Sequence, residues 1–137
     1  PSEKNSKVAD VFPWGNTWPP PAGSGNYWSE ELRPLQAAGK HASFKGELPG
    51  YRDGHAETAP VGVYAANGFG LHDLGGNVWE WCEDWFDASQ KDRVLRGGSW
   101  SFNDRGRLLS SYRSHYSPGA RYYYYGFRCV VSALSAR

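Results

Sequence analysis

The sequence has no methionine and few cysteines or histidines among its 137 residues. The two cysteines, Cys82 and Cys129, allow one disulfide or two free thiols. Neither belongs to a C-x-x-C pair, which excludes zinc ribbons and thioredoxin-like chemistry. No two of the four histidines have a spacing typical of metal ligands, and no G-x-S-x-G motif surrounds Ser99. Hydrolase chemistry at Ser99 therefore has little support.

Long apolar runs are also missing. No stretch approaches the roughly 20 residues of a transmembrane helix, so we expect no membrane span. No signal-peptide pattern opens the chain, which begins with Pro1 and not with an initiator methionine. We therefore expect a processed, trimmed or partial chain. Its compartment is left open, with a surface-exposed, extracellular or periplasmic location slightly favoured.

Acidic residues are absent from position 105 onward. The chain carries a net charge of +1, and the six arginines of this last part leave −5 for residues 1–104. Solvated or internally paired arginines are one explanation, and a surface for anions or nucleic acid is another. Nucleic acid is the less favoured partner, because the rest of the chain is acidic and contains no RNA-binding motif.

Glycine, proline and aromatic residues dominate what is present. With 17 glycines, 9 prolines and 16% aromatics, the chain must turn often and bury tryptophan and tyrosine in place of aliphatics. Ser29 is a plausible N-cap of a short helix that Pro34 limits. We expect short strands at 61–64, 93–100, 108–116 and 122–133, with an alternating stretch at the end of 66–81. The pattern predicts one loop-rich α+β domain at 12–137 after a loose segment at 1–11, with loops so long that they need an organiser.

Five motifs occur in order: FPWGN, YRDGHAETAPVGVYAANGFGLHDL, GLHDLGGNVWEWCEDWF, RVLRGGSW and GFRC. They resemble the formylglycine-generating enzyme, or sulfatase-modifying factor, family from about Phe12 to Val131. The resemblance implies a C-type-lectin-like fold. The N-terminal half that family domains carry before FPWGN is absent here, so we expect either that this chain is the C-terminal portion of a longer domain or that a partner chain or segment supplies the rest. In relatives the cysteine of GFRC pairs with one in that half, and we therefore predict no bridge between Cys82 and Cys129.

The resemblance also implies calcium as the organiser of the loops. Calcium takes six to eight oxygens from carboxylates and carbonyls. One expected ligand set lies in DLGGNVWE, with the side chains of Asp73 and Glu80 and the carbonyls of Gly76 and Val78. The second set spans two loops, with side chains from Asn26 and Asp53 and carbonyls from Tyr27 and His55. Without the resemblance, all these acids would be taken for capping or surface residues.

Copper is not expected. The enzymes of the family hold copper with two cysteines shortly after GGS, and copper(I) prefers such thiolates. By resemblance the matching positions are Phe102 and Arg107, which offer no sulfur. We therefore expect no formylglycine formation and no catalytic residues. An alternative remains, in which the chain is an oxidoreductase or accessory subunit that uses a metal on a partner chain or domain.

Tyrosine and arginine concentrate between GGSW and GFR, where the family enzymes hold their substrate. If 122–125 is a strand, alternate tyrosines face opposite sides; a two-sided sheet strand is the plain explanation. A binding surface is the functional one, because tyrosine, serine and arginine dominate paratopes. The layout resembles the variable proteins of diversity-generating retroelements, so we expect a diversified receptor that binds a protein or other macromolecule. The expected contact residues are Ser101, Phe102, Asn103, Asp104, Arg105, Arg107, Ser114, His115, Tyr116, Arg121, Tyr122, Tyr123, Tyr124 and Tyr125.

Overall fold

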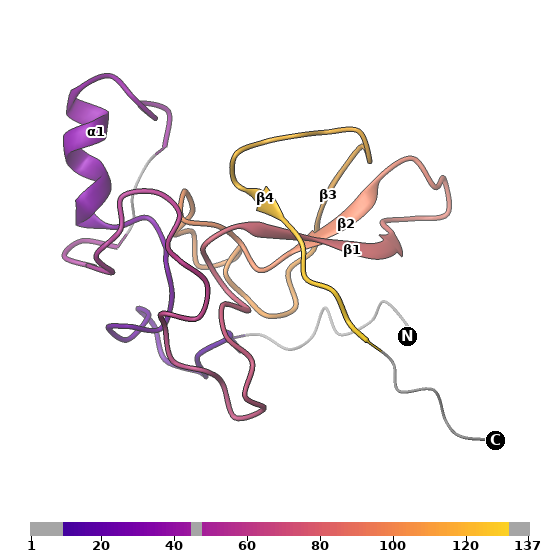
Figure 1. Ribbon diagram of the computed structural model, residues 1–137, viewed down its shortest axis with the longest axis horizontal. Coiled ribbons are helices and arrows are strands. Elements are labelled where there is room, and N and C mark those ends of the chain that lie inside the picture. Colours follow the sequence, from indigo (N-terminus) through magenta and orange to yellow (C-terminus); the bar gives the residue numbers. More distant parts are fainter. Residues whose placement is uncertain (1–9, 45–47, 132–137) are drawn as a thin grey trace.

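The computed structural model describes residues 10–44 and 48–131. Most of the expected N-terminal segment, residues 1–9, and the end of the last expected strand, 132–133, lie outside the described residues, as does Arg137. Helix α1 lies at one end of the molecule and a small sheet toward the other, with long loops between them (Figure 1). The expected loop-rich α+β class, with little regular secondary structure, is confirmed, and the fold is C-type-lectin-like.

The sheet has four strands in the order β3-β2-β1-β4. Its central pair is antiparallel, with β1 (Trp79–Trp85) against β2 (Arg93–Arg96). Strand β3 (Ser114–Tyr116) adds antiparallel to β2, and β4 (Tyr125–Gly126) adds parallel to β1. The two outer strands thus place the tyrosine-rich segments at opposite edges of one small sheet.

The helical segment is shorter and differently capped than expected. One turn of 3-10 helix, Glu30–Leu32, leads into α1 (Arg33–Ala37), with Pro34 tolerated in its first turn. Ser29 precedes this segment but makes no capping hydrogen bond. Its hydroxyl donates instead to the carbonyl of His55 at 3.3 Å, because the side chain is buried against that loop.

All four expected strands are shorter than expected or absent. The strand expected at 93–100 ends at Arg96, and the one expected at 108–116 begins only at Ser114. Residues 61–64 form turns and no strand, since Val61 and Val63 are exposed and have no neighbouring strand. The expected strand at 122–133 is reduced to Tyr125–Gly126. The amide of Tyr125 donates to the carbonyl of Tyr122 at 3.0 Å, so the tyrosines enter the sheet through a turn and simple alternation fails.

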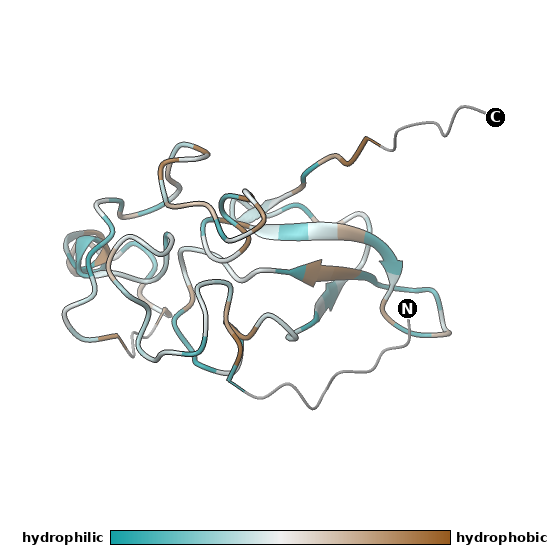
Figure 2. Ribbon diagram, turned by 90° about the horizontal axis from the view of Figure 1, so that it is seen from below, coloured by the Kyte–Doolittle hydropathy of each residue, from teal (hydrophilic) through white to brown (hydrophobic). Residues whose placement is uncertain are grey.

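Aromatic residues build both parts of the core. One buried cluster joins Phe12, Tyr27 and Tyr51 to two leucines, and the other joins Trp28, Leu32 and Trp100. Strand β2 carries the apolar pair Val94 and Leu95, each 1% exposed and visible as a brown stretch in Figure 2. Because the aliphatic content is low, rings provide the burial that holds the loops.

Asn77, two residues before β1, links three loops through hydrogen bonds. Its side-chain oxygen accepts from the amide of Ala59 at 2.9 Å and from the side chain of Asn26 at 3.2 Å. Its backbone amide donates to the carbonyl of Asn26 at 2.7 Å, and its carbonyl accepts from Trp100. Next to it, Gly76 has φ +79, and a Cβ there would lie 2.2 Å from the carbonyl oxygen of Asn26. Only glycine permits this approach.

Candidate functional site: an aromatic surface and two loop sites

Five tyrosines from β3, β4 and the turn before β4 form one cluster, although β3 and β4 lie at opposite edges of the sheet. Tyr116 on β3 lies edge-on to Tyr122, with ring centroids 5.5 Å apart and hydroxyls 3.4 Å apart. Tyr122 stacks on Tyr124 at 5.4 Å and meets Tyr125 edge-on at 5.0 Å. Tyr123 meets Tyr124 edge-on at 5.0 Å. We call Tyr116 and Tyr122–Tyr125 the tyrosine cluster.

The members of the tyrosine cluster differ in exposure. Tyr122 and Tyr123 are 41% and 60% exposed, and Tyr116 is exposed as well. Tyr124 and Tyr125 are half-buried, and burial raises the pKa of both, that of Tyr125 to about 12. The cluster therefore presents three rings to solvent on a base of two packed ones.

Two of the expected contact residues are buried. Ser101 and Asn103 are 4% and 2% exposed, and the hydroxyl of Ser101 shares a hydrogen bond with Ser99 at 2.9 Å. Phe102 is half-buried and packs edge-on against Trp79. These side chains support the loop and do not present a surface.

Another group of expected contact residues is exposed but lies elsewhere. Arg105 forms an ion pair with Asp10 at 2.7 Å, beside the rings of Phe12 and Trp18. Arg107 lies over Phe102, and the amide of Arg107 is capped by Asp104. At the other end of β3, His115 bonds Asp92 at 2.7 Å, next to the half-buried Ser114. Arg121 is exposed directly before the tyrosines. Its position makes Arg121 the arginine of this set best placed beside the cluster.

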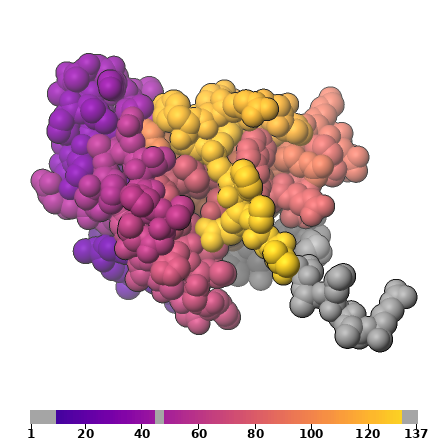
Figure 3. Space-filling model, viewed as in Figure 1, coloured from indigo at the N-terminus to yellow at the C-terminus, as the bar shows by residue number. Residues whose placement is uncertain are grey.

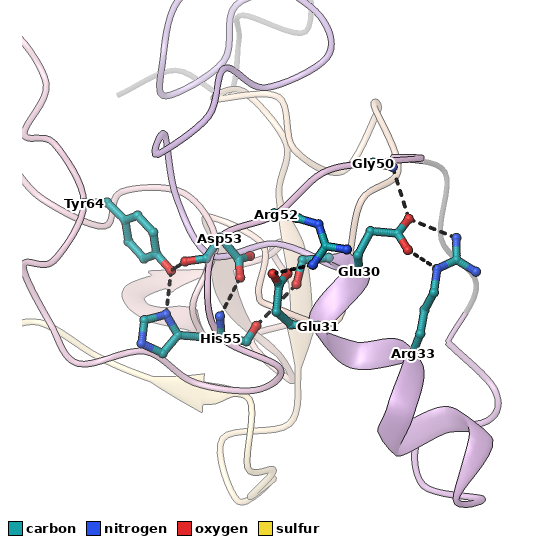
Figure 4. Close-up of polar contacts among 9 residues, drawn as sticks. Glu30, Glu31, Arg33, Gly50, Arg52, Asp53, His55 and Tyr64 are labelled. Atoms are coloured by element: carbon teal, nitrogen blue, oxygen red, sulfur yellow. Dashed lines mark hydrogen bonds and ion pairs between the residues drawn. The ribbon is translucent and has the colours of Figure 1, made fainter.

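The structure brings the Asn26–Asp53 set together. The carboxylate of Asp53 accepts from the amides of Tyr27 at 3.0 Å and His55 at 2.9 Å, so it bridges the two loops. Figure 4 shows Asp53 between His55 and Tyr64, whose hydroxyl donates to the carbonyl of Asp53 at 3.1 Å. Burial raises the pKa of the Asp53 carboxyl. These contacts join the loop of Tyr27 to the loop of Asp53 and His55.

The side chain of Asn26 provides the test for a cation at this set of residues. It is fully buried, and its amide nitrogen donates to the carbonyl of Glu57 at 2.7 Å and to Asn77. Its oxygen Oδ1 has no hydrogen-bond partner among the described residues. A buried oxygen without a donor costs about 1–3 kcal/mol, and it is a suitable ligand for calcium. The residues therefore fit the expected ion.

In the Asp73–Glu80 set, an arginine side chain binds the expected calcium ligands. The guanidinium of Arg128 binds both oxygens of Glu80, with Nε donating to Oε2 at 2.7 Å. It also donates to the carbonyls of His72 and Asp73, each at 3.0 Å. The side-chain oxygen Oδ2 of Asp73 accepts from the amide of Gly62 at 2.7 Å. The other oxygen of Asp73, Oδ1, is buried and, like Oδ1 of Asn26, has no hydrogen-bond partner among the described residues. An arginine thus holds the Glu80 carboxylate that calcium would need here, while Asp73 keeps an oxygen suited to a cation.

Sulfur is not gathered at either site. Cys82 is half-buried on β1, where burial raises the pKa of its thiol, and Cys129 is exposed after β4; both are free. In residues 10–44 and 48–131, no three side chains of histidine, cysteine, aspartate or glutamate are grouped to bind a metal. Over the same residues, no helix has the length and apolar character of a membrane span.

Three residues important in the structure were missed by sequence reasoning. The sequence assigned Arg128 no role beyond its contribution to the positive charge after residue 104, yet its guanidinium binds the carboxylate of Glu80. Asn77 links three loops. The sequence indicates this role only by placing an asparagine, which tolerates a positive φ, directly after two glycines. His41 approaches Tyr123 across 82 positions of sequence, and no local pattern predicts such a contact.

Comparison with known proteins places the chain among characterised sequences. The family model of the sulfatase-modifying factor enzyme 1-like domain matches residues 7–133. The formylglycine-generating enzyme of Streptomyces coelicolor is 36% identical over 132 residues, covering 82% of this chain and 42% of the relative. The inactive C-alpha-formylglycine-generating enzyme 2 of Bos taurus is 36% identical over 131 residues, covering 90% and 38%. The chain thus spans about two fifths of the length of these two relatives.

A solved structure shows the same architecture. Treponema denticola variable protein 1 superposes with a TM-score of 0.54 at 28% identity, covering 77% of this chain and 34% of that one. Both an enzyme class and a variable protein therefore occur among the similar proteins.

Proposed function

Because this chain belongs to the sulfatase-modifying factor family, we propose that it is a calcium-stabilised ligand-binding domain that holds a protein through its tyrosine cluster. The observation that carries the proposal is the cluster itself. Tyr116, Tyr122 and Tyr123 are exposed, while the rings beneath them are packed. Stiff aromatic side chains on a fixed base lose little conformational entropy on binding, which is why paratopes use tyrosine.

The residues at the two expected copper positions favour a binding function over an oxidase function. Phe102 packs against Trp79, and Arg107 lies over Phe102, so neither position supplies sulfur. Copper(I) needs soft ligands. Metal analysis of the purified protein separates the two functions, since calcium without copper or iron is expected from a binding domain. Stoichiometric copper or iron would favour the oxidoreductase alternative.

The binding surface is tested by diversification. We expect that a displayed library varied at Tyr116, Arg121, Tyr122 and Tyr123, selected against hen lysozyme, yields variants that bind at least about tenfold more tightly than the parent, a gain of roughly 1.4 kcal/mol. The reason is that these residues are exposed and their replacement leaves the packed rings in place.

A control library varies the same number of residues at other exposed positions, so that the two libraries are equal in size. It varies four exposed residues on β1 and in the loop that joins β1 to β2, namely Glu83, Asp87, Gln90 and Lys91. If this control library yields lysozyme binders as often as the first, the tyrosine cluster is no preferred binding surface and the proposal fails.

Calcium is proposed at both loop sets, with different consequences. At the first, Asn26 and Asp53 offer side-chain oxygens to an ion that fixes one loop to the other. At the second, calcium must displace Arg128 from Glu80. One bound calcium per chain would mean that Arg128 keeps its place, and two would mean that it is displaced.

The exposed apolar residues around the groove at Phe69 are proposed to bind the part of the domain that relatives carry beyond the match. Val61, Phe69 and Val131 are 87%, 89% and 92% exposed, and Phe69 borders a groove of about 920 Å³ that reaches Trp14. The C-terminal segment lies beside this region in Figure 3, tied to it by Arg128. Large exposed apolar patches mark interaction sites.

The partner proposal has a direct test. The unmatched part of the Streptomyces coelicolor relative, expressed separately, is expected to form a one-to-one complex with this chain in analytical ultracentrifugation. Phe69→Asp should weaken the complex by roughly tenfold or more, because it places a charge in the apolar contact. Lys91→Asp, which alters an exposed residue away from the groove, should not. Absence of any complex would contradict the proposal.

A further inference from the structure

A second, smaller hollow opens beside the tyrosine cluster. It has a volume of about 210 Å³ and is lined by His41, Glu57, Thr58, Trp100 and Tyr123. Only Tyr123 is shared with the tyrosine cluster. The hollow therefore combines aromatic walls with one carboxylate.

The three rings hold one another in place. Tyr123 stacks on Trp100 with centroids 5.9 Å apart, and His41 meets Trp100 edge-on at 5.0 Å. On its other side His41 stacks flat on Phe44 at 5.4 Å. Trp100 is 1% exposed, so the base of the hollow is part of the core. Such walls are rigid and pre-organised for a ligand.

A chain of hydrogen bonds sets the polar side of the hollow. The ring of His41 bonds Oε1 of Glu57 through Nε2 at 2.7 Å and the hydroxyl of Tyr123 through Nδ1 at 3.3 Å. In the tautomer with its proton on Nε2, His41 donates to Glu57 and accepts from the hydroxyl of Tyr123. Among the described residues no lysine or arginine pairs with Glu57, whose side chain is 52% exposed. The hollow thus has a negative group available to an incoming cation.

We propose that this hollow binds a quaternary ammonium group. Aromatic faces attract such cations by about 0.5–2 kcal/mol per ring, and a nearby carboxylate adds Coulomb attraction. A primary ammonium has three N–H donors to satisfy. The side-chain acceptors that line the hollow come from Glu57, Thr58 and Tyr123, and two of these residues also bond His41, while the other walls are rings. A methylated ammonium needs no acceptors, and therefore it suits ring walls better.

Choline is the probe, and 3,3-dimethylbutan-1-ol, its neutral carbon isostere, is the control. Titration followed by tryptophan fluorescence or NMR is expected to show saturable choline binding in the millimolar range, roughly 1–10 mM, and at least about fivefold weaker binding of the alcohol. Equal binding of the two compounds, or no saturation by choline below roughly 100 mM, would overturn the proposal.

Variants assign the binding to the hollow. Glu57→Gln and Tyr123→Leu are each expected to weaken choline binding about fivefold or more, since one removes the charge and the other the ring. Tyr123→Phe keeps the ring and should stay within about twofold. If Glu57→Gln binds choline as the parent does, the site is not this one. Circular dichroism of each variant verifies that it is folded.

The proposal is independent of protein binding by the tyrosine cluster, apart from the shared Tyr123. Tyr122→Leu alters an exposed ring that does not line the hollow. It should leave choline affinity unchanged within about twofold. Loss of choline binding in this variant would contradict the assignment, whereas failure of the lysozyme selections would leave the choline result untouched.

Discussion

Replacement of Asn77 by alanine is expected to lower the free energy of unfolding by about 3–5 kcal/mol, because it leaves buried polar groups without hydrogen-bond partners. The side chain is 6% exposed and makes three hydrogen bonds, two of them with the backbone of Ala59. Without it, the amide of Ala59 and the side chain of Asn26 lose a partner in a site closed to water. Alanine also tolerates φ +58 poorly. Urea denaturation measures the change as a shift in midpoint at constant m-value.

Two further substitutions separate the effect of the lost hydrogen bonds from that of the positive φ and provide a surface control. Asn77→Gly removes the same hydrogen bonds but permits the positive φ, so it should be less destabilising than Asn77→Ala by up to about 1 kcal/mol. Asn16→Ala, at an exposed position, should change stability by less than about 0.5 kcal/mol. If Asn77→Ala costs no more than Asn16→Ala, then Asn77 does not hold the loops together.

Removal of calcium is expected to have an effect of similar size. At free calcium about 100-fold above the dissociation constant, binding adds roughly 2.7 kcal/mol to folding, and its loss should lower the melting temperature by about 10 °C. The physical reason is that the buried oxygen of Asn26 and the Asp53 carboxyl, whose pKa burial raises, lose their cation. Thermal unfolding with excess calcium and with EGTA gives the difference.

Asp53→Asn is expected to abolish most of this calcium response, because it removes the charged ligand that bridges the loops. Asp84→Asn changes an exposed acid on β1 and should leave the response intact. A melting temperature that EGTA does not change in the parent chain would rule out calcium as the organiser. Magnesium in place of calcium should restore little, since it requires a more regular geometry.

Local patterns along the chain were sufficient for the fold class, and their limits appear in the tyrosine segment. The alternation at the end of 66–81 and the segment RVLRGGSW indicated β1 and β2, where Trp79 of β1 and the pair Val94 and Leu95 of β2 are buried. The run at 122–125 was expected to be a strand, but Tyr124 is drawn into the cluster of Trp28, Leu32 and Trp100 and the chain turns. Competition from distant aromatic partners is not visible in a local pattern.

The sequence by itself determined the family, the α+β class, the scarcity of sulfur and the tyrosine-rich segment, since these depend on residue types and their order. Only the tertiary structure decided which side chains are exposed and that Arg128 binds the carboxylate of Glu80. It also brought His41 and Tyr123 together with Glu57 in one hollow. Such contacts join residues up to 82 positions apart. They are set by how loops pack on an aromatic core, and this packing depends on the whole chain at once.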